Sequence, residues 1–424
     1  MSDAAATAPK RIPTDWKAGA MQQRIRRRYA AERRFRLIGM FAVLLSAGFL
    51  AFLLISMLSN GLKGFTQTEI RLEMDFAKSA LMIDPAALKN SSGGAALAGA
   101  DIEGAVAAAA EAQYGPQGAR MLSDTAWIRV QRAIESDPDI LMRKESLWLP
   151  ASSEIDQAAK GDSAAEAEAV VARLEQGDAL KTGFNAEFLT GADATDPAAA
   201  GIWGAFKGSL LTMLVTLALA FPVGVLSAVY LEEYAARNRW TDLIEVSINN
   251  LAAVPSIIFG LLGLAVFLNT MHLPRSAPLV GGLTLALMTM PVIVIAGRNA
   301  IKSVPPSIRD AALGIGASRV QVVFHHVLPL ALPGILTGTI IGMARALGET
   351  APLLMIGMRA FISTPPGGFT EPATVLPVQV FLWSDEVSKG FVEKTSAAII
   401  VLLLFLLAMN GLAIYLRNKF ERRW

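Results

Sequence analysis

The sequence predicts an all-α polytopic membrane protein with six transmembrane helices and an α or α+β insert between the first two. Of its 424 residues, 53% are hydrophobic and only 17% are charged, a balance typical of membrane proteins. Six apolar segments are long enough for a bilayer core of about 30 Å, which takes about 20 helical residues. These segments are 37–58, 208–230, 246–268, 278–297, 329–357 and 396–416.

Charge on the flanks of the spans predicts that both termini are cytoplasmic. Segment 1–36 carries ten Lys and Arg against three acids, and tail 417–424 carries four against one. Lys and Arg are enriched in cytoplasmic flanks, and an even number of crossings returns the chain to its starting side. Segment 1–36 lacks interleaved aromatics, so it resembles an anchor near anionic lipid more than a nucleic-acid patch. Loop 231–245, with four acids and two arginines, is the exception to the rule.

An insert at 59–201 is placed outside the membrane by this orientation. It holds 22 acids against 12 bases, and the stretches around Trp127 and Trp148 are apolar enough for a small core. Its Ala- and Gly-rich middle predicts loose segments near 91–118 and 188–200. Nothing in the insert resembles a catalytic constellation, so we expect a structural or docking module more than a ligand-binding one.

The loop at 305–328 predicts a helix–turn–helix outside the membrane. Pro305 and Pro306 stop the preceding helix, and Ser307 with Asp310 forms a capping-box pattern. Gly316 can separate the two helical pieces. The second piece carries an apolar stripe at i, i+3, i+4 and i+7, formed by Val320, Val323, Phe324 and Val327. Such a stripe packs either on its own helix bundle or into a soluble partner.

The same loop resembles the EAA loop of bacterial ABC-importer permeases. The spacing matches throughout: Asp310-Ala311-Ala312, three residues, Gly316, nine residues, then His326-Val327-Leu328-Pro329. Asp310 stands for the usual glutamate, and His326 for the usual isoleucine. The resemblance implies that segment 307–327, with Val320 and Phe324, docks on an ATP-hydrolysing subunit. This chain has no G-x-x-x-x-G-K-[ST] phosphate loop, so ATP is expected to be a ligand of that partner, and we expect no cofactor, catalytic residue or metal here.

Two further stretches resemble the phosphate-transport permeases of the PstA type. They are INNLAAVPSIIFGLLGLAVF at 248–267 and ARALGETAPLL at 344–354, and the likeness covers the transport core at 202–416 but not the insert. It implies a subunit of an inorganic phosphate importer in a bacterial inner membrane. The implied partners are a pair of ATP-binding subunits, a second permease of the PstC type and an extracytoplasmic phosphate-binding protein, besides the lipid bilayer. Another oxyanion stays open as the substrate.

Charges inside the fifth span are the candidate substrate site. Gly334, Gly338 and Gly342 form a small-residue stripe that lets helices approach closely. At 100° per residue, Arg345 lies within about 20° of Gly334, and Glu349 falls about 40° further round. Both charges are therefore expected to point into the bundle or across a permease dimer.

Two roles are open for this pair. It is either a structural i, i+4 ion pair or a substrate site, in which Arg345 binds phosphate oxygens and Glu349 holds the guanidinium. Intramembrane charges favour the second role. Thr350 adds a hydroxyl, and the resemblance adds Arg298, near the end of the fourth span, to the pathway.

Two other classes of protein fit less well. An ion-coupled secondary transporter that acts alone ordinarily has several acids in its spans and inverted repeats, whereas these spans hold a single acid. A membrane-bound enzyme requires a nucleophile, a His pair or a carboxylate pair at a common site, and the sequence offers none of them.

Overall fold

The computed structural model describes residues 19–79, 81, 83, 88, 97, 99–161 and 165–420. It divides into two compact units, Met1–Met57 and Leu58–Trp424. The first half of the predicted basic segment, the end of the predicted tail and part of the predicted loose segment at 91–118 lie outside the described residues.

The described residues of the first unit, from Gly19 onward, form one helix. Helix α1 runs from Gly19 to Gly64, and its last residues belong to the second unit. It begins well before the predicted span at 37, because Arg, Gln and Ala, which fill the preceding segment, are good helix formers.

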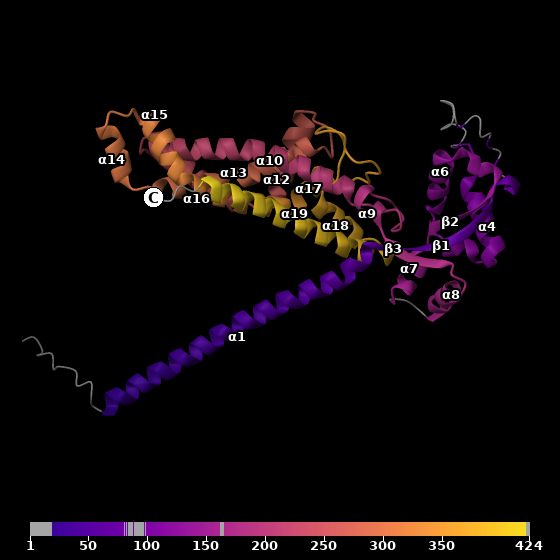
Figure 1. Ribbon diagram of the computed structural model, residues 1–424. Helices are drawn as coiled ribbons and strands as arrows, with labels where there is room; N and C mark the ends of the chain where they lie inside the picture. The colour runs from indigo at the N-terminus through magenta and orange to yellow at the C-terminus, as the bar shows by residue number, and fades with distance from the viewer. Residues whose placement is uncertain are drawn as a thin grey trace, which may run out of the picture. The chain divides into compact units, whose positions relative to one another are not determined.

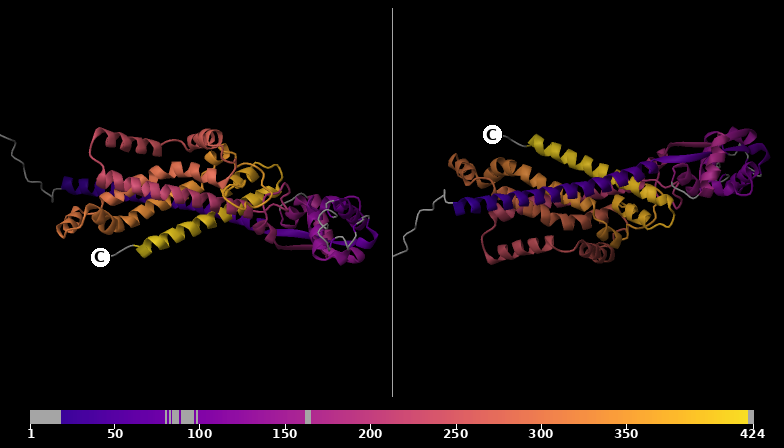
Figure 2. Two further views of the ribbon diagram at one scale, coloured as in Figure 1. Left: turned by 90° about the horizontal axis from the view of Figure 1, so that it is seen from above. Right: turned by 90° about the horizontal axis from the view of Figure 1, so that it is seen from below.

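The insert is an α+β domain built on a three-stranded antiparallel sheet (Figures 1 and 2). Its strands are β1 (Thr66–Asp75), β2 (Lys144–Pro150) and β3 (Leu180–Phe184), in the order β2-β1-β3. Alternate residues of β1, including Ile70 and Leu72, are fully buried against Val130 and Ile134, as the two-residue period of a strand requires. Trp127 packs at the edge of this core, whereas Trp148 lies on the other face under Lys181.

Helices surround the sheet, and one of them lies in the predicted loose segment at 91–118, whereas residues 191–200 of the predicted loose segment at 188–200 carry neither helix nor strand. The helices are α4 (Ile102–Tyr114), α5 (Gly118–Met121), α6 (Ala126–Ser136), α7 (Ser153–Ala159), α8 (Ala165–Gln176) and α9 (Ala186–Thr190). Short η1 (Phe76–Lys78) and η2 (Pro138–Met142) complete the domain. The prediction was wrong for 102–114, because alanine is the strongest helix former and Asp101 caps the helix by accepting from Gly104 N.

The second part of the chain is a helix bundle. Its long helices are α10 (Trp203–Val229), α13 (Pro278–Lys302), α16 (Leu328–Leu347) and α19 (Gly390–Phe420). The shorter helices are α11 (Arg239–Ala252), α12 (Ser256–Gly263), α14 (Pro306–Gly314), α15 (Arg319–Gln321), α17 (Ala351–Met355) and α18 (Leu376–Ser384). Three π-helical turns extend or connect them: η3 (Tyr230–Tyr234), η4 (Leu264–Thr270) and η5 (Val322–Val327). Helix α13 is central, since both α10 and α16 pack along it.

Five helices in the described part are long and apolar enough to cross a membrane, or six if one bent pair counts as a span. The bent pair is α11 with α12 and η4, which meet at 101°. The span predicted at 246–268 is therefore bent at Pro255. Pro255 supplies no N–H for a continuous helix, and the chain turns there. The span predicted at 329–357 is also shorter, because α16 ends at Leu347 and α17 starts at Ala351.

The glycine stripe of α16 faces α13. A Cβ added at Gly334 or Gly338 would meet the Cβ of Ala300 or Ala296, and one at Gly342 would meet Thr289 at 3.0 Å. The two backbones thus approach as closely as small residues allow.

Gly338→Leu is expected to lower the free energy of unfolding by about 2–3 kcal/mol, because the added carbons overlap Ala296 in a packed interface. Thermal unfolding of the purified permease in detergent measures this. Gly411→Ala is the matched control: it lies in α19, and a Cβ there meets nothing within 4 Å. Equal melting temperatures for both variants would contradict the close packing of α16 on α13.

Candidate functional site

The helix–turn–helix at 305–328 is present, with a different start from the predicted one. Helix α14 begins at Pro306 with Pro305 as its N-cap, and no side-chain cap is formed. Proline fits a first helical turn because its missing N–H is not needed there. The capping box instead joins Ser318 and Gln321 at the start of α15. Gly316 makes the turn between the helices with φ of +90°, a value that favours glycine.

The predicted apolar stripe divides between two environments. Val323 and Val327 are buried in the bundle with Ala312. Val320 and Phe324, by contrast, are 56% and 45% exposed. One edge of the stripe therefore packs on the chain itself, and the other edge faces outward.

The exposed apolar residues form a patch around the turn. They are Leu313, Ile315, Val320 and Phe324, and Ile315 is 82% exposed. Asp310, Ala311 and Gly316 are also exposed, whereas Leu328 and Pro329 are half-buried at the start of α16. We call Leu313, Ile315, Val320 and Phe324 the turn patch. Apolar side chains gathered on an exposed helical hairpin indicate a docking surface.

Arg309 fastens α14 to the end of α10. Its guanidinium donates to Glu233 Oε1 at 2.6 Å and to the carbonyl oxygens of Val304 and Ile301 at 2.7 and 3.0 Å. Glu233 is only 12% exposed. Charge-assisted bonds of this kind are stronger than neutral ones, so Arg309 holds α14 firmly to η3, the turn that extends α10.

Arg309→Met is expected to loosen α14, because Glu233 loses its partner and two carbonyls lose their donor. Since both side chains keep some exposure, we expect a cost of about 2 kcal/mol. Amide hydrogen exchange in 306–314 then accelerates about 30-fold, as mass spectrometry can measure. Arg319→Met, an exposed arginine of the same hairpin, serves as control. Unchanged exchange in Arg309→Met would show that α14 is held by other contacts.

Arg298 is neutralised by acids from two other helices. Its guanidinium lies 2.9 Å from Glu245 of α11 and 3.4 Å from Glu232 of η3. The sequence interpretation placed Arg298 in the substrate pathway, and in the structure its guanidinium joins α13 to η3 and α11. Loop 231–245 is an exception to the positive-inside pattern because of four acids, and three of these are the partners of Arg298 and Arg309: Glu232, Glu233 and Glu245. Sequence reasoning missed these pairs, because nothing local joins residues 66 and 76 positions apart.

Arg345 lies at the end of α16, where the fifth span breaks. Its side chain is 51% exposed, and its Nε is 3.5 Å from Glu349 Oε1. Helix α16 ends at Leu347, so Glu349 and Thr350 lie in the break rather than on the helix. Of the two predicted orientations, into the bundle or across a permease dimer, Glu349 takes the first, since its side chain is 19% exposed, whereas Arg345 is not covered by this chain. Measured from Gly342, the nearest stripe residue, Arg345 lies about 60° away, beyond the cover of α13.

A broken helix at this depth has a physical consequence. Backbone groups freed within a membrane are tolerated only where they are covered by protein or line a water-filled cavity. Helix α17, which begins directly after the break, packs on α12, since a Cβ at Gly260 would overlap Pro352. Arg345 is therefore presented beside irregular backbone, on a surface that this chain alone leaves open.

Known proteins resemble both parts of the chain. Residues 202–423 match the family "Binding-protein-dependent transport system inner membrane component", and residues 22–169 match a domain of unknown function, DUF3333. A probable ABC transporter permease protein, YqgI of Bacillus subtilis, is 35% identical over 44% of this chain and 62% of its own length. The phosphate transport system permease protein PstA 1 of Mycobacterium tuberculosis is 35% identical over 37% of this chain and 51% of its own length.

A third relative is covered more fully. The PstA protein of Yersinia pestis is 31% identical over 51% of this chain and 72% of its own length. The chain thus spans between about half and three quarters of these relatives. Among solved structures, an inward-facing MetNI methionine ABC transporter is 18% identical, covers 52% of this chain and 95% of its own, and has a TM-score of 0.41.

Proposed function

The chain belongs to the family of binding-protein-dependent transport system inner membrane components, in its PstA type, and on this premise we propose that it is a permease subunit of an ATP-driven phosphate importer. It is a multi-pass protein of the inner membrane. The relatives named as phosphate transport permeases support phosphate as the substrate.

The observation that carries the proposal is the exposed guanidinium of Arg345 at a broken span. Two other basic groups in the described spans are already bound by protein groups. Arg298 pairs with two glutamates, and Lys394 is buried against a carbonyl oxygen. Arg345 has one long contact, to Glu349. A planar guanidinium with free donors suits tetrahedral oxyanions.

Each residue of this site has a distinct role in the proposal. Arg345 binds two phosphate oxygens, and the Thr350 hydroxyl donates to a third. Glu349 holds the guanidinium from the other side and weakens anion binding enough to permit release, since a site that binds too tightly does not conduct. The second permease subunit, of the PstC type, covers the face that is open in this chain.

Coupling to ATP is assigned to the other end of the bundle. The insert adjoins the start of α10, whereas the 307–327 segment adjoins its end, where Arg309 binds Glu233 (Figure 1). With both termini cytoplasmic, the insert is extracytoplasmic and the turn patch reaches a pair of ATP-hydrolysing subunits. The chain itself binds no ATP, and an extracytoplasmic phosphate-binding protein delivers the substrate.

Uptake into vesicles tests the proposal. The chain is reconstituted with its ATP-hydrolysing, permease and binding-protein partners, and uptake of radiolabelled phosphate is measured with excess sulfate as competitor. We expect uptake that requires hydrolysable ATP, resists sulfate and persists in a protonophore. Uptake of sulfate instead would reassign the substrate to another oxyanion. Uptake that stops with the protonophore but ignores ATP would make the protein an ion-coupled transporter.

A further inference from the structure

The insert and the bundle meet through an apolar cluster as well as through buried charges. The insert has a core of its own, formed by residues between Ile70 and Ala179. In a separate cluster, Phe188 of α9, which belongs to the insert, packs with Trp383, Phe391 and Ala397 of the bundle. Interfaces between domains ordinarily permit relative motion unless they are large and apolar, so the buried charges beside this cluster bear on whether the insert moves.

A buried charge cluster lies at this interface. Lys160, which follows α7 of the insert, places its Nζ 2.6 Å from Asp156 Oδ2 and 2.9 Å from Glu393 Oε2 of α19. The Lys160 side chain is 6% exposed and that of Glu393 is 10% exposed. Lys160 also donates to the carbonyl oxygen of Thr66 at 3.0 Å, and Asp156 accepts from the Thr68 amide at 2.8 Å. One ammonium thus joins α7, β1 and α19.

The next residue of α19 joins two more elements. Lys394 is 5% exposed, donates to the carbonyl oxygen of Gly64 at 3.3 Å and lies 5.1 Å from the ring centroid of Phe188. Gly64 is the last residue of α1, where a helix favours a cation. A Cβ at Gly64 would come within 2.6 Å of the carbonyl oxygen of Glu393. The end of α1 and the start of α19 are therefore in backbone contact.

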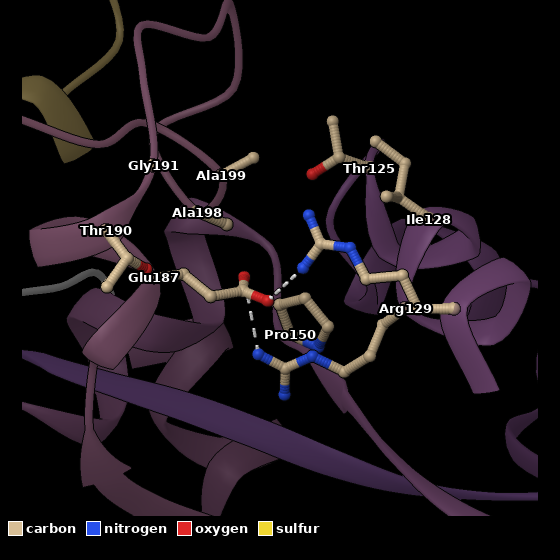
Figure 3. A pocket seen from close by; sticks show the side chains of 10 residues that line it. Thr125, Ile128, Arg129, Pro150, Glu187, Thr190, Gly191, Ala198 and Ala199 are labelled. Carbon is tan, nitrogen blue, oxygen red and sulfur yellow. Dashed lines mark hydrogen bonds and ion pairs between the residues drawn. The ribbon is translucent and has the colours of Figure 1, made fainter. Parts of the chain in front are cut away.

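A second group of charges fastens α9 and the segment before α10 to the rest of the insert. Arg132 of α6 donates to Glu187 Oε1 of α9 at 2.7 Å, and Arg129 reaches Glu187 Oε2 at 3.5 Å, across a cavity of about 170 Å³ (Figure 3). Asp196, in the segment before α10, accepts from Thr125 Oγ1 at 3.0 Å and also from Ser123. Because Phe188 of α9 packs on the bundle, these bonds join the whole insert to that apolar contact.

Opening this interface would leave charges without partners in a place that water reaches poorly. Separation of α7 from α19 leaves the Glu393 carboxylate without Lys160, and loss of one partner from a buried ion pair is strongly unfavourable. Buried charge pairs therefore do not suit an interface that must open in every transport cycle.

We propose that the insert moves with α19 as one rigid body during transport, and that Lys160 is the positioning residue that holds it there. Because α19 packs against α16, the insert is mechanically joined to the helix that carries Arg345. This inference rests on the proposed function only in treating the chain as a transporting permease, and it does not depend on the substrate.

A disulfide across the joint tests the proposal directly. The chain has no cysteine, so an introduced pair is the sole pair within it. A Cβ built at Gly390 would contact Ser153 Oγ, which makes Ser153→Cys with Gly390→Cys the pair of choice. The reconstituted complex is oxidised in the nucleotide-free state and again with ATP trapped by vanadate. Electrophoresis then gives the extent of cross-linking, which requires no knowledge of the substrate.

We expect the same cross-linking in both states, and uptake by the oxidised complex within about twofold of the reduced one. Cross-linking confined to one state, or uptake that stops on oxidation and returns on reduction, would overturn the proposal. If the pair prevents assembly, hydrogen exchange of 66–70 and 153–160 in the native chain replaces it. Protection that is equal in both states supports a rigid joint, and protection lost in one state contradicts it. Failure of phosphate uptake in the unmodified complex would count against the proposed function alone.

Lys160→Met tests the positioning role. Phosphate uptake is expected to fall at least tenfold while basal ATP hydrolysis is retained, and the oxidised disulfide is expected to restore uptake in the triple variant. Lys78→Met is the matched control, since Lys78 is an insert lysine that is 85% exposed. Normal uptake in Lys160→Met, or uptake that the disulfide does not restore, would show that Lys160 does not act by holding the insert.

Discussion

Arg345→Gln is expected to reduce ATP-driven phosphate uptake about 100-fold without loss of the assembled complex. Two charge-assisted hydrogen bonds to an oxyanion are together worth about 3 kcal/mol, and each 1.4 kcal/mol is a factor of ten. Assembly is retained because the side chain is 51% exposed and supports little packing. Uptake of radiolabelled phosphate and co-purification of the partner subunits are the two measurements.

Two controls separate charge from geometry in this experiment. Arg345→Lys keeps the charge but lacks the planar fork, so uptake between that of Arg345→Gln and that of the unmodified protein is expected. Arg237→Gln removes an exposed arginine from the loop before α11 and is expected to have no effect. Normal uptake in Arg345→Gln would make the pair with Glu349 a structural one and would remove Arg345 from the pathway.

Ile315→Asp is expected to weaken binding of the ATP-hydrolysing subunits about 100-fold and to stop uptake. Ile315 is 82% exposed, so the substitution has little effect on folding of the free permease. In the docked complex, however, the aspartate is buried without a partner, which costs about 3 kcal/mol. Co-purification at graded concentrations of the ATP-hydrolysing subunit measures the change.

The matched control places the same substitution at a distant exposed residue. Val387 is 97% exposed in the segment between α18 and α19, and Val387→Asp is expected to leave binding of the ATP-hydrolysing subunit unchanged. If Ile315→Asp binds that subunit normally, the turn patch is not the docking surface. If both variants lose binding, the effect is one of added charge and not of position.

The long spans could be predicted from sequence because their cause is local. Twenty apolar residues in a row have no alternative to a helix in a membrane, and α10, α13 and α19 lie where the pattern indicates. The bend in the third span could not be predicted in the same way. Pro255 marks a possible break, but the 101° angle between α11 and α12 depends on what packs around it.

The candidate site was harder to predict from the sequence, because its contacts also depend on how the helices pack. Helical geometry locates Arg345 relative to Gly334 but does not say where α13 stops covering α16. The same limit applies to the predicted apolar stripe of segment 307–327. On this stripe Val323 and Val327 are buried, whereas Val320 and Phe324 are exposed. The partners of Arg298 and Arg309 are distant in sequence, and such pairs become visible only when the helices are assembled.

The pairing of Glu233 with Arg309 also sets an order of events during synthesis. The acid at the end of α10 is made 76 residues before its arginine, and Glu232 is made 66 residues before Arg298. At about 5–20 residues per second, the two carboxylates wait roughly 3–15 s for their partners. Closure of this end of the bundle therefore follows emergence of α14 from the ribosome. An unfinished chain presents a bare acidic helix end, and the hairpin at 305–328 becomes fixed only when the last of these arginines has been added.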